Sequence, residues 1–420
     1  MRDGMRRKGL MAAAALLSGV LTLSACSGGG DDEPAGDSRD GGSEQSDADR
    51  AAEDANTSTA VISITPDDAA DGVGINDDVQ VSVEGGTLDE VVLTAAESGT
   101  EVAGTISGDG ASWAPDAQLD RGTKYELSVQ ASDAEGREAH ETRTFTTVSP
   151  ENSFTGYFTP EDGTTVGVGM PVSLNFDKPI ENRAEIEAAV EINSTSGQEI
   201  VGHWFSDTRL DFRPEDYWAA NSEVTVDLNF DGVEGAADVI GWQDRTFSFT
   251  VGRSQISTVD AESHQMEVVR DGQPLRTVPI SAGSEETPTY NGIMVISEKL
   301  EETRMNGATV GFTDDDGEGE YDIPDVPHAM RLSTSGTFVH GNYWAADGVF
   351  GSSNTSHGCI GLNDAQGADD PDTDGAWFFE ESLLGDVIVV VNSPDREIQP
   401  DNGLNGWNMS WADWQAGSAL

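Results

Sequence analysis

The stretch "HGNYWAADGVFGSSNTSHGCIGL", residues 340–362, contains Cys359, one of only two cysteines in this chain of 420 residues. The alternating run "MRLSTSGTFVH" before it predicts a strand that ends at His340. A free thiol has a pKa of about 8.5, so it is mostly neutral near neutral pH and becomes a strong nucleophile when an imidazole takes its proton. We therefore predict that Cys359 is a nucleophile and that His340 is its base.

A second histidine, His357, competes for the role of base. It precedes Cys359 by two residues, so on an extended segment it shares a face with the thiol but does not reach it in line. The loop of residues 341–355 is long enough to fold back and bring His340 beside Cys359, and we assign the base role to His340. Gly358 lets a substrate carbonyl approach the backbone closely and leaves amide N–H groups for an oxyanion.

The other cysteine, Cys26, ends an export signal. A basic head with Arg6 and Arg7 precedes the apolar run "GLMAAAALLSGVLTL", which is too short to span a bilayer. The sequence "LSAC" at residues 23–26 resembles the bacterial lipobox, whose cysteine receives a lipid and becomes the new N-terminus. We predict a signal peptide over residues 1–26 and a lipid anchor at Cys26, with a plain signal peptide as the alternative.

The charge of the chain limits its partners. With 22 lysines and arginines against 77 acidic residues, the net charge is −55. Nucleic acid and anionic membrane faces would repel such a protein, so we expect no nucleic-acid partner. Residues 27–58 contain no valine, isoleucine, leucine or aromatic residue, and we expect a disordered acidic linker there.

Two tandem immunoglobulin-like β-sandwiches are predicted after the linker, over residues 59–149 and 150–252. Short alternating runs are separated by glycine, aspartate and asparagine, which is typical of such sandwiches. The pattern of "ASWAPDAQLDRGTKYELSVQA" at 111–131 recurs in "LDFRPEDYWAANSEVTVDLNF" at 210–230, each with an aromatic residue, a proline, a loop and an alternating strand. Neither region has a cluster of residues at catalytic or metal-binding spacing.

A β-rich third domain is predicted over residues 253–393, followed by a C-terminal tail over 394–420. Two alternating strands joined across Asp271–Gly272 predict a hairpin. The run "AWFFEESLL" has helical character, and "DVIVVVN" predicts a buried strand. The predicted fold class is mainly β, with one short helix in this domain.

His340, fifteen intervening residues and then "SHGC" resemble the signature of L,D-transpeptidase catalytic domains of the YkuD type. The resemblance extends over most of 253–420 and includes "TPTYNG", "SGTFVHG", "GDVIVVVN" and the tail "NGLNGWNMSWADWQAGSA". With the lipobox and two immunoglobulin-like modules in front, the chain is similar to the actinobacterial members. The lipid anchor would then hold the protein on the outer face of the cytoplasmic membrane, facing the cell wall.

The resemblance implies a reaction without a metal or organic cofactor. Cys359 would form a thioester with a peptidoglycan tetrapeptide stem, and a second stem would take the acyl group to form a cross-link between two diaminopimelate residues. The carbonyl of Gly341, where many members have serine, would orient His340. The family pattern has asparagine where this chain has Gly361, so a side-chain hydrogen bond is missing there. The substrate and oxyanion positions would be Tyr321, Ser356, His357 and Gly358.

Alternative functions remain open at this stage. An L,D-carboxypeptidase would pass the same acyl-enzyme to water. In a catalytically silent cell-wall-binding lipoprotein the sandwiches would act alone, although the presence of both His340 and Cys359 argues against decay. A papain-type protease would have its cysteine before its histidine, which is the reverse of the order here. The oligomeric state is not indicated.

Two further patterns give hypotheses about the third domain. Asp370, Asp372, Asp374, Gly375 and Glu381 match the spacing of a calcium loop, although in so acidic a chain the match arises easily. Three tryptophans in the tail have helical spacing and predict a stripe that docks the tail onto the catalytic domain; they are Trp407, Trp411 and Trp414. Two others, Trp344 and Trp377, are interpreted as core packing.

Overall fold

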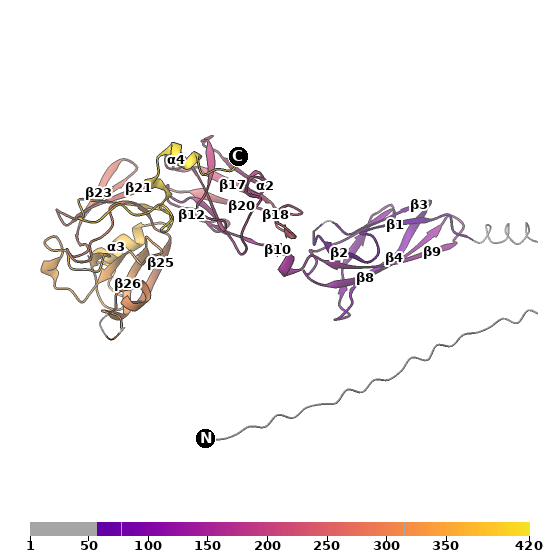
Figure 1. The fold of residues 1–420 in the computed structure, drawn as a ribbon, viewed down its shortest axis with the longest axis horizontal. Coiled ribbons are helices and arrows are strands. Elements are labelled where there is room, and N and C mark those ends of the chain that lie inside the picture. Colours follow the sequence, from indigo (N-terminus) through magenta and orange to yellow (C-terminus); the bar gives the residue numbers. More distant parts are fainter. Residues whose placement is uncertain (1–56, 77, 314–315, 317) are drawn as a thin grey trace, which may run out of the picture. The chain divides into compact units, whose positions relative to one another are not determined.

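The computed structural model describes residues 57–76, 78–313, 316 and 318–420. The predictions for the signal peptide, for the lipid anchor at Cys26 and for most of the linker lie outside the described residues. Figure 1 shows that strands dominate the described part of the chain, which confirms the predicted mainly β fold class. In that part, no helix combines the length and the apolar character needed to cross a membrane.

The first sandwich packs two antiparallel-rich sheets against each other, with strand orders β1-β3-β7-β6 and β2-β9-β8-β4-β5. Along β8 every second residue is buried, because alternate side chains of a strand point to opposite faces. The strands are β1 (Val61–Thr65), β2 (Ala70–Val73), β3 (Gln80–Glu84), β4 (Gly86–Ala95), β5 (Glu101–Val102), β6 (Gly104–Ile106), β7 (Ser112–Pro115), β8 (Lys124–Asp133) and β9 (Glu138–Thr147).

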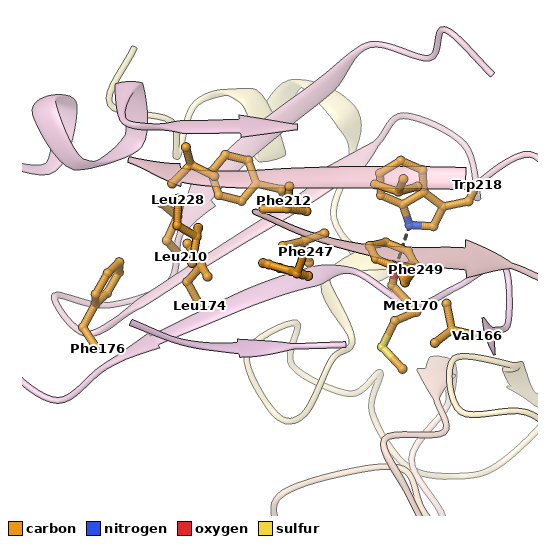
Figure 2. Packing of buried hydrophobic residues seen from close by; sticks show 14 of the residues in the cluster. Val166, Met170, Leu174, Phe176, Leu210, Phe212, Trp218, Leu228, Phe247 and Phe249 are labelled. Carbon is orange, nitrogen blue, oxygen red and sulfur yellow. Dashed lines mark hydrogen bonds between the residues drawn. The ribbon is translucent and has the colours of Figure 1, made fainter. Parts of the chain in front are cut away.

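The second sandwich has sheets of order β11-β13-β16-β15 and β12-β20-β17-β14 and a small sheet of order β10-β19-β18. Figure 2 shows its aromatic core, in which the Trp218 indole donates to the Met170 carbonyl at 2.6 Å. The elements are η1 (Pro150–Asn152), β10 (Ser153–Phe154), β11 (Gly156–Thr159), β12 (Thr165–Val166), β13 (Val172–Phe176), α2 (Arg183–Ala188), β14 (Val190–Ser194), β15 (Ile200–Trp204), β16 (Arg209–Pro214), β17 (Glu223–Asn229), β18 (Glu234–Ala236), β19 (Val239–Gly241) and β20 (Asp244–Val251).

The third domain is built on a nine-stranded sheet of order β24-β29-β21-β22-β23-β28-β27-β26-β25. The predicted hairpin is confirmed: Arg270 faces Gln273 across Asp271 and Gly272, which both have positive φ. The elements are β21 (Gln255–Asp260), β22 (Gln265–Arg270), β23 (Gln273–Ser281), β24 (Gly292–Val295), β25 (Glu298–Asn306), η2 (Gly307–Val310), β26 (Asp322–Arg331), β27 (Phe338–Asn342), η3 (Asp347–Val349), β28 (Ile360–Asn363), α3 (Asp374–Glu381), β29 (Val387–Val391), η4 (Gly406–Asn408) and α4 (Trp411–Gln415).

Helix α3 forms where the sequence predicted helical character. The Thr373 side chain accepts a hydrogen bond from the Ala376 amide, which satisfies one of the free N–H groups at the helix start. The helix buries Phe378 and Phe379 and packs against β26, β27 and β28. It therefore covers one face of the part of the sheet that carries His340.

The second sandwich and the third domain share one hydrophobic core. Val387 of β29 is fully buried in the same cluster as Val166 and Phe249 of the sandwich. Beside it, Arg253 donates two hydrogen bonds at 2.8 Å to the buried carboxylate of Asp386. A continuous core of this kind makes the two domains one packed unit.

The predicted docking of the tail onto the catalytic domain is correct only in part. Asn405 and Asn408 do hydrogen-bond β24 of the catalytic domain. The Trp407 indole instead donates to Gly169 at 2.7 Å, and the Trp414 indole donates to Val201 at 2.9 Å, and both acceptors belong to the second sandwich.

The reason for this tail docking is a buried arginine of the second sandwich. The Arg213 guanidinium lies 4.7, 5.4 and 4.4 Å from the ring centres of Trp407, Trp411 and Trp414. A desolvated guanidinium is attracted to the negative faces of indole rings. Burial lowers the pKa of Arg213 to about 10.

Candidate active site

Two neighbouring parallel strands bring His340 and Cys359 to one cavity. In the pairing of β27 with β28, His340 lies opposite Gly361, and Cys359 directly precedes β28. Because side chains alternate along strands, residues 359 and 361 point to the same face of the sheet. His340 points to that face too, because it is paired with Gly361. Both side chains line a cavity of about 400 Å³.

The His340 imidazole is fixed by its neighbour. The side chain is buried, and its Nδ1–H donates to the Gly341 carbonyl at 2.8 Å, which is the contact predicted for Gly341. This bond leaves Nε2 as the nitrogen that can take a proton. Burial lowers the pKa of His340, while the bond to Gly341 and the charge of Asp364 act in the opposite direction.

The Cys359 thiol is neutral at rest. It is 9% exposed, and its Sγ lies 3.6 Å from the Gly336 carbonyl, to which it donates. Burial raises the pKa of Cys359 to about 11. Because so little thiolate exists near neutral pH, this thiol needs a base at the moment of attack.

The competing histidine points elsewhere. The Nε2 of His357 lies 3.2 Å from Glu320 Oε2, and the ring packs against Phe312 and Tyr321. His357 lines the cavity, but its outer nitrogen faces a carboxylate at the surface. It forms part of the cavity wall rather than a bond to Cys359 Sγ.

Tyr321 also lines the cavity, as predicted. Burial, together with the charges of Cys359 and Glu320, raises the pKa of Tyr321 to about 12. Its hydroxyl therefore keeps its proton over the physiological range and can donate a hydrogen bond to a substrate oxygen.

The turn before the cysteine is held by Ser356. The Ser356 hydroxyl donates to the Cys359 carbonyl at 2.6 Å and accepts the Gly358 amide at 3.2 Å. Gly358 has a φ of +105°, which L side chains rarely adopt. These two residues shape the backbone beside the thiol, so the serine hydroxyl is occupied by the turn itself.

Sequence reasoning missed part of the cavity wall. Trp344 was interpreted as core packing, but it is 44% exposed and its ring stacks 5.7 Å from the His340 ring. Its position four residues after His340, at the start of the long loop, was the signal in the sequence that could have placed Trp344 at the cavity. Trp377, by contrast, does pack against the core of the third domain. Further cavity residues that the sequence did not single out are Met305, Ile323, Asn342, Ala345, Val349 and Thr355.

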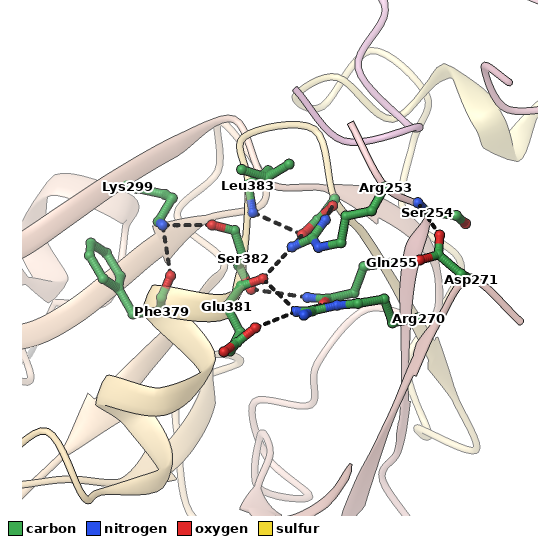
Figure 3. Close-up of polar contacts among 11 residues, drawn as sticks. Arg253, Ser254, Gln255, Arg270, Asp271, Lys299, Phe379, Glu381, Ser382 and Leu383 are labelled. Carbon is green, nitrogen blue, oxygen red and sulfur yellow. Dashed lines mark hydrogen bonds and ion pairs between the residues drawn. The ribbon is translucent and has the colours of Figure 1, made fainter. Parts of the chain in front are cut away.

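The calcium-loop hypothesis is wrong for the arrangement seen. Glu381 pairs with Arg270 at 2.6 Å, as Figure 3 shows, and Asp374 pairs with Arg276. Arginine partners thus take two of the four carboxylates that were expected to converge on a cation. Among the residues that the structure describes, no group of three or more histidine, cysteine or acidic side chains could hold a metal ion.

Comparison with known proteins agrees with this geometry. A model of the L,D-transpeptidase catalytic domain matches residues 254–390, and a bacterial Ig domain model matches residues 70–234. L,D-transpeptidase 2 of Mycobacterium tuberculosis is 32% identical over 84% of this chain and 83% of its own length. This chain belongs to the L,D-transpeptidase family. L,D-transpeptidase 5 of the same organism is 30% identical over 84% of this chain and 76% of its own length.

A solved L,D-transpeptidase from Mycobacterium smegmatis aligns with 57% of this chain and 99% of its own, at 28% identity and a TM-score of 0.44. The two family models and L,D-transpeptidase 2 make the protein an L,D-transpeptidase in which an Ig-like region precedes the catalytic domain. Enzymes of this family act on peptidoglycan stems.

Proposed function

We propose that Cys359 is the nucleophile and His340 the general base of this L,D-transpeptidase, and that the product is a cross-link between two diaminopimelate residues. The observation that carries the proposal is the bond from His340 Nδ1 to the Gly341 carbonyl at 2.8 Å, in a cavity that the thiol also lines. That bond fixes the tautomer in which Nε2 accepts a proton.

In the first half of the reaction, Sγ of Cys359 bonds to the carbonyl carbon between the diaminopimelate L-centre and the following D-Ala, while the thiol proton passes to His340 Nε2. The tetrahedral oxyanion would accept hydrogen bonds from the backbone amide of Cys359 and from the Tyr321 hydroxyl, because the Gly358 amide already donates to the Ser356 hydroxyl. The C–N bond then breaks, His340 gives its proton to the leaving amine, and D-Ala departs from a thioester.

In the second half, the side-chain amine of another stem's diaminopimelate attacks the thioester carbon. His340 takes a proton from that amine, the C–S bond breaks, and the proton returns to the sulfur. We further propose that the protein is exported and anchored by a lipid at Cys26 on the outer face of the cytoplasmic membrane, since "LSAC" follows a signal-like N-terminus.

The test of the reaction is incubation of the protein with a disaccharide-tetrapeptide, followed by mass spectrometry. Loss of D-Ala together with a cross-linked dimer is the expected result, whereas free tripeptide without dimer would mean an L,D-carboxypeptidase. Cys359→Ala is expected to give neither product. Because carbapenems carry a strained acyl group, intact mass should show one carbapenem adduct on the wild type and none on Cys359→Ala.

The base assignment is tested with two histidine variants. His340→Ala is expected to slow acylation by about 10²-fold or more, the usual contribution of a general base. Its thiol should react with iodoacetamide only as pH approaches about 11, the pKa that burial gives Cys359. His357→Ala is the matched control and should keep the reactivity of the wild type near neutral pH. If His357→Ala loses that reactivity and His340→Ala keeps it, the two roles are reversed.

A further inference from the structure

A buried carboxylate lies behind the catalytic strand. Gly341 follows His340 on β27, so its position faces the side of the sheet opposite to the cavity. A Cβ at residue 341 would lie 2.0 Å from Asp364 Oδ2, and a Cβ at Gly375 of α3 would lie 2.1 Å from the same oxygen. The carboxylate therefore fills the space between β27 and α3, in contact with both glycines.

Donors surround this carboxylate. Asp364 Oδ1 accepts hydrogen bonds from the Thr373 hydroxyl at 2.7 Å and from the Ala365 amide at 2.8 Å. Oδ2 accepts a bond of 2.8 Å from Nδ1 of His328 on β26. A group that only accepts is an ionised carboxylate. The side chain of Asp364 is 0% exposed and that of His328 is 7% exposed, so the charge is kept away from water.

Such a group needs an explanation, because an ionised side chain is costly to bury. Asp364 takes no part in the acyl-transfer steps and lines no part of the cavity of Cys359. Asp364 nevertheless lies against Gly341, the residue next to His340, and His340 Nδ1 is bonded to the carbonyl of Gly341. The carboxylate contacts Gly341 from behind while the carbonyl of that same residue orients the imidazole in front.

We propose that Asp364 is a positioning residue of the transpeptidase reaction: it fixes the Gly341 backbone from behind, and its negative charge stabilises the imidazolium that forms when His340 takes the thiol proton. The proposal rests on the proposed role of His340. The charge of Asp364 opposes the effect of burial on the pKa of His340, which agrees with this role. The Gly341 carbonyl and the Trp344 ring contact His340, and the titratable groups that share its cavity are Cys359, Tyr321 and His357. The charge of Asp364 acts on it from the other side of the sheet.

The same contact accounts for the glycine after the catalytic histidine. A serine at residue 341 would put its Cβ into the carboxylate of Asp364. Gly341 and Asp364 are thus a matched pair: residue 341 can carry a side chain only if the carboxylate at residue 364 is removed.

The test measures the rate at which a carbapenem acylates Cys359 as a function of pH, by intact mass, on the full exported chain. His340 must be neutral to act as base, so the acylation rate falls as pH drops through its pKa; we call this fall the acid limb of the pH profile. In Asp364→Asn the pKa of His340 should be lower than in the wild type, so the acid limb should move to lower pH. The plateau rate should drop about tenfold, the factor that corresponds to one pKa unit.

His328→Gln is the control for packing, because it keeps a donor to Asp364 and leaves the carboxylate charge in place. Its acid limb should stay where it is in the wild type or move to higher pH. If Asp364→Asn matches the wild type, or if both variants move the limb equally toward low pH, Asp364 does not act through its charge and the proposal is overturned. His357→Ala, run alongside, identifies any part of the limb that belongs to the other cavity histidine.

A second pair of variants keeps the proposal testable if Asp364→Asn does not fold. Gly341→Ser alone should lose most acylation, whereas Gly341→Ser/Asp364→Ala, which frees the space, should regain it only up to the lower plateau expected of Asp364→Asn, with its acid limb at lower pH. Failure of the double variant to exceed Gly341→Ser would overturn the matched pair. Cys359→Ala and His340→Ala are measured in parallel: if they react like the wild type, the proposed function has failed rather than this inference.

Discussion

The two sandwiches have similar architecture, but they differ in how they join the rest of the molecule. The first has its own core, and it meets the second where Trp242 packs against that core and where Arg121 donates a bond of 3.0 Å to Ser153. The second shares its core with Val387 of the catalytic sheet and receives the tail tryptophans around Arg213. Similar folds thus serve as a separate module in one case and as half of a catalytic unit in the other.

Deletion of each sandwich should give the largest contrast. A chain lacking residues 58–149 is expected to keep the melting temperature and the acylation rate of the remaining unit. A chain lacking residues 58–252 exposes Val387 and the tail tryptophans, and it should fail to fold into an active domain. Circular dichroism melts and carbapenem acylation measure both. An active, cooperatively folded chain of residues 253–420 would break the comparison.

Two matched tryptophan variants should separate the sandwiches in a full-length chain. Trp113 of the first core is 3% exposed and Trp414 of the tail is 1% exposed, so replacing either by alanine should cost about 3–5 kcal/mol locally. Trp113→Ala should melt the first sandwich alone and leave acylation unchanged. Trp414→Ala should destabilise the catalytic unit and slow acylation. Equal acylation rates for the two variants, measured at a temperature between their transitions, would contradict the shared-core description.

Acid should affect the two regions in opposite directions. In the first sandwich, desolvation raises the pKa of Asp133, but bonds from Thr59 and Arg137 outweigh it and hold the pKa below its ordinary value of 3.8. At the shared core, burial outweighs the Arg253 partner and raises the pKa of Asp386. The stability from Asp133 is present above its unfolded pKa and is lost as pH falls, whereas the contribution of Asp386 is present in acid and is lost as pH rises.

Thermal melts between neutral pH and pH values below 3.8 should therefore show the first sandwich losing stability before the catalytic unit. Asp133→Asn should flatten the dependence for the first sandwich, and Asp386→Asn should change only the second transition. A first transition whose pH dependence is the same in Asp133→Asn and in the wild type would show that this carboxylate is not the cause.

The smallest effect is expected from the exposed pair of Arg270 and Glu381, whose side chains are 26% and 39% exposed. Glu381→Gln should lower stability by less than about 1 kcal/mol, because water screens such pairs. Calcium at millimolar concentration should raise the melting temperature no more than magnesium at equal ionic strength. A specific calcium shift that disappears in Glu381→Gln would restore the calcium-loop hypothesis.

The proposed nucleophile and base could be located because their signal is local: the spacing and the glycines point to His340 and Cys359. The predicted strand end was wrong, because β27 runs from Phe338 to Asn342 and His340 lies within it. The destination of the tail could not, since helical spacing predicts a stripe of tryptophans but not the surface that carries Arg213. The calcium pattern failed because two of its carboxylates, Asp374 and Glu381, have arginine partners that are distant in sequence. Asp364 was missed because one buried aspartate has no local mark among 77 acidic residues, and the glycine at residue 341 was the only hint.

The docking of the tail on the second sandwich also determines the order in which the domains can finish folding. The bonds from Trp407 to Gly169 and from Trp414 to Val201 join residues 238 and 213 positions apart. Among the described residues, the first sandwich contains only partners that are nearer in sequence, so it can finish folding as soon as its own strands are available. The second sandwich keeps its aromatic surface exposed until residues beyond 400 have been added to the chain and can dock. We therefore expect a slow last folding step and a need for protection from aggregation before it.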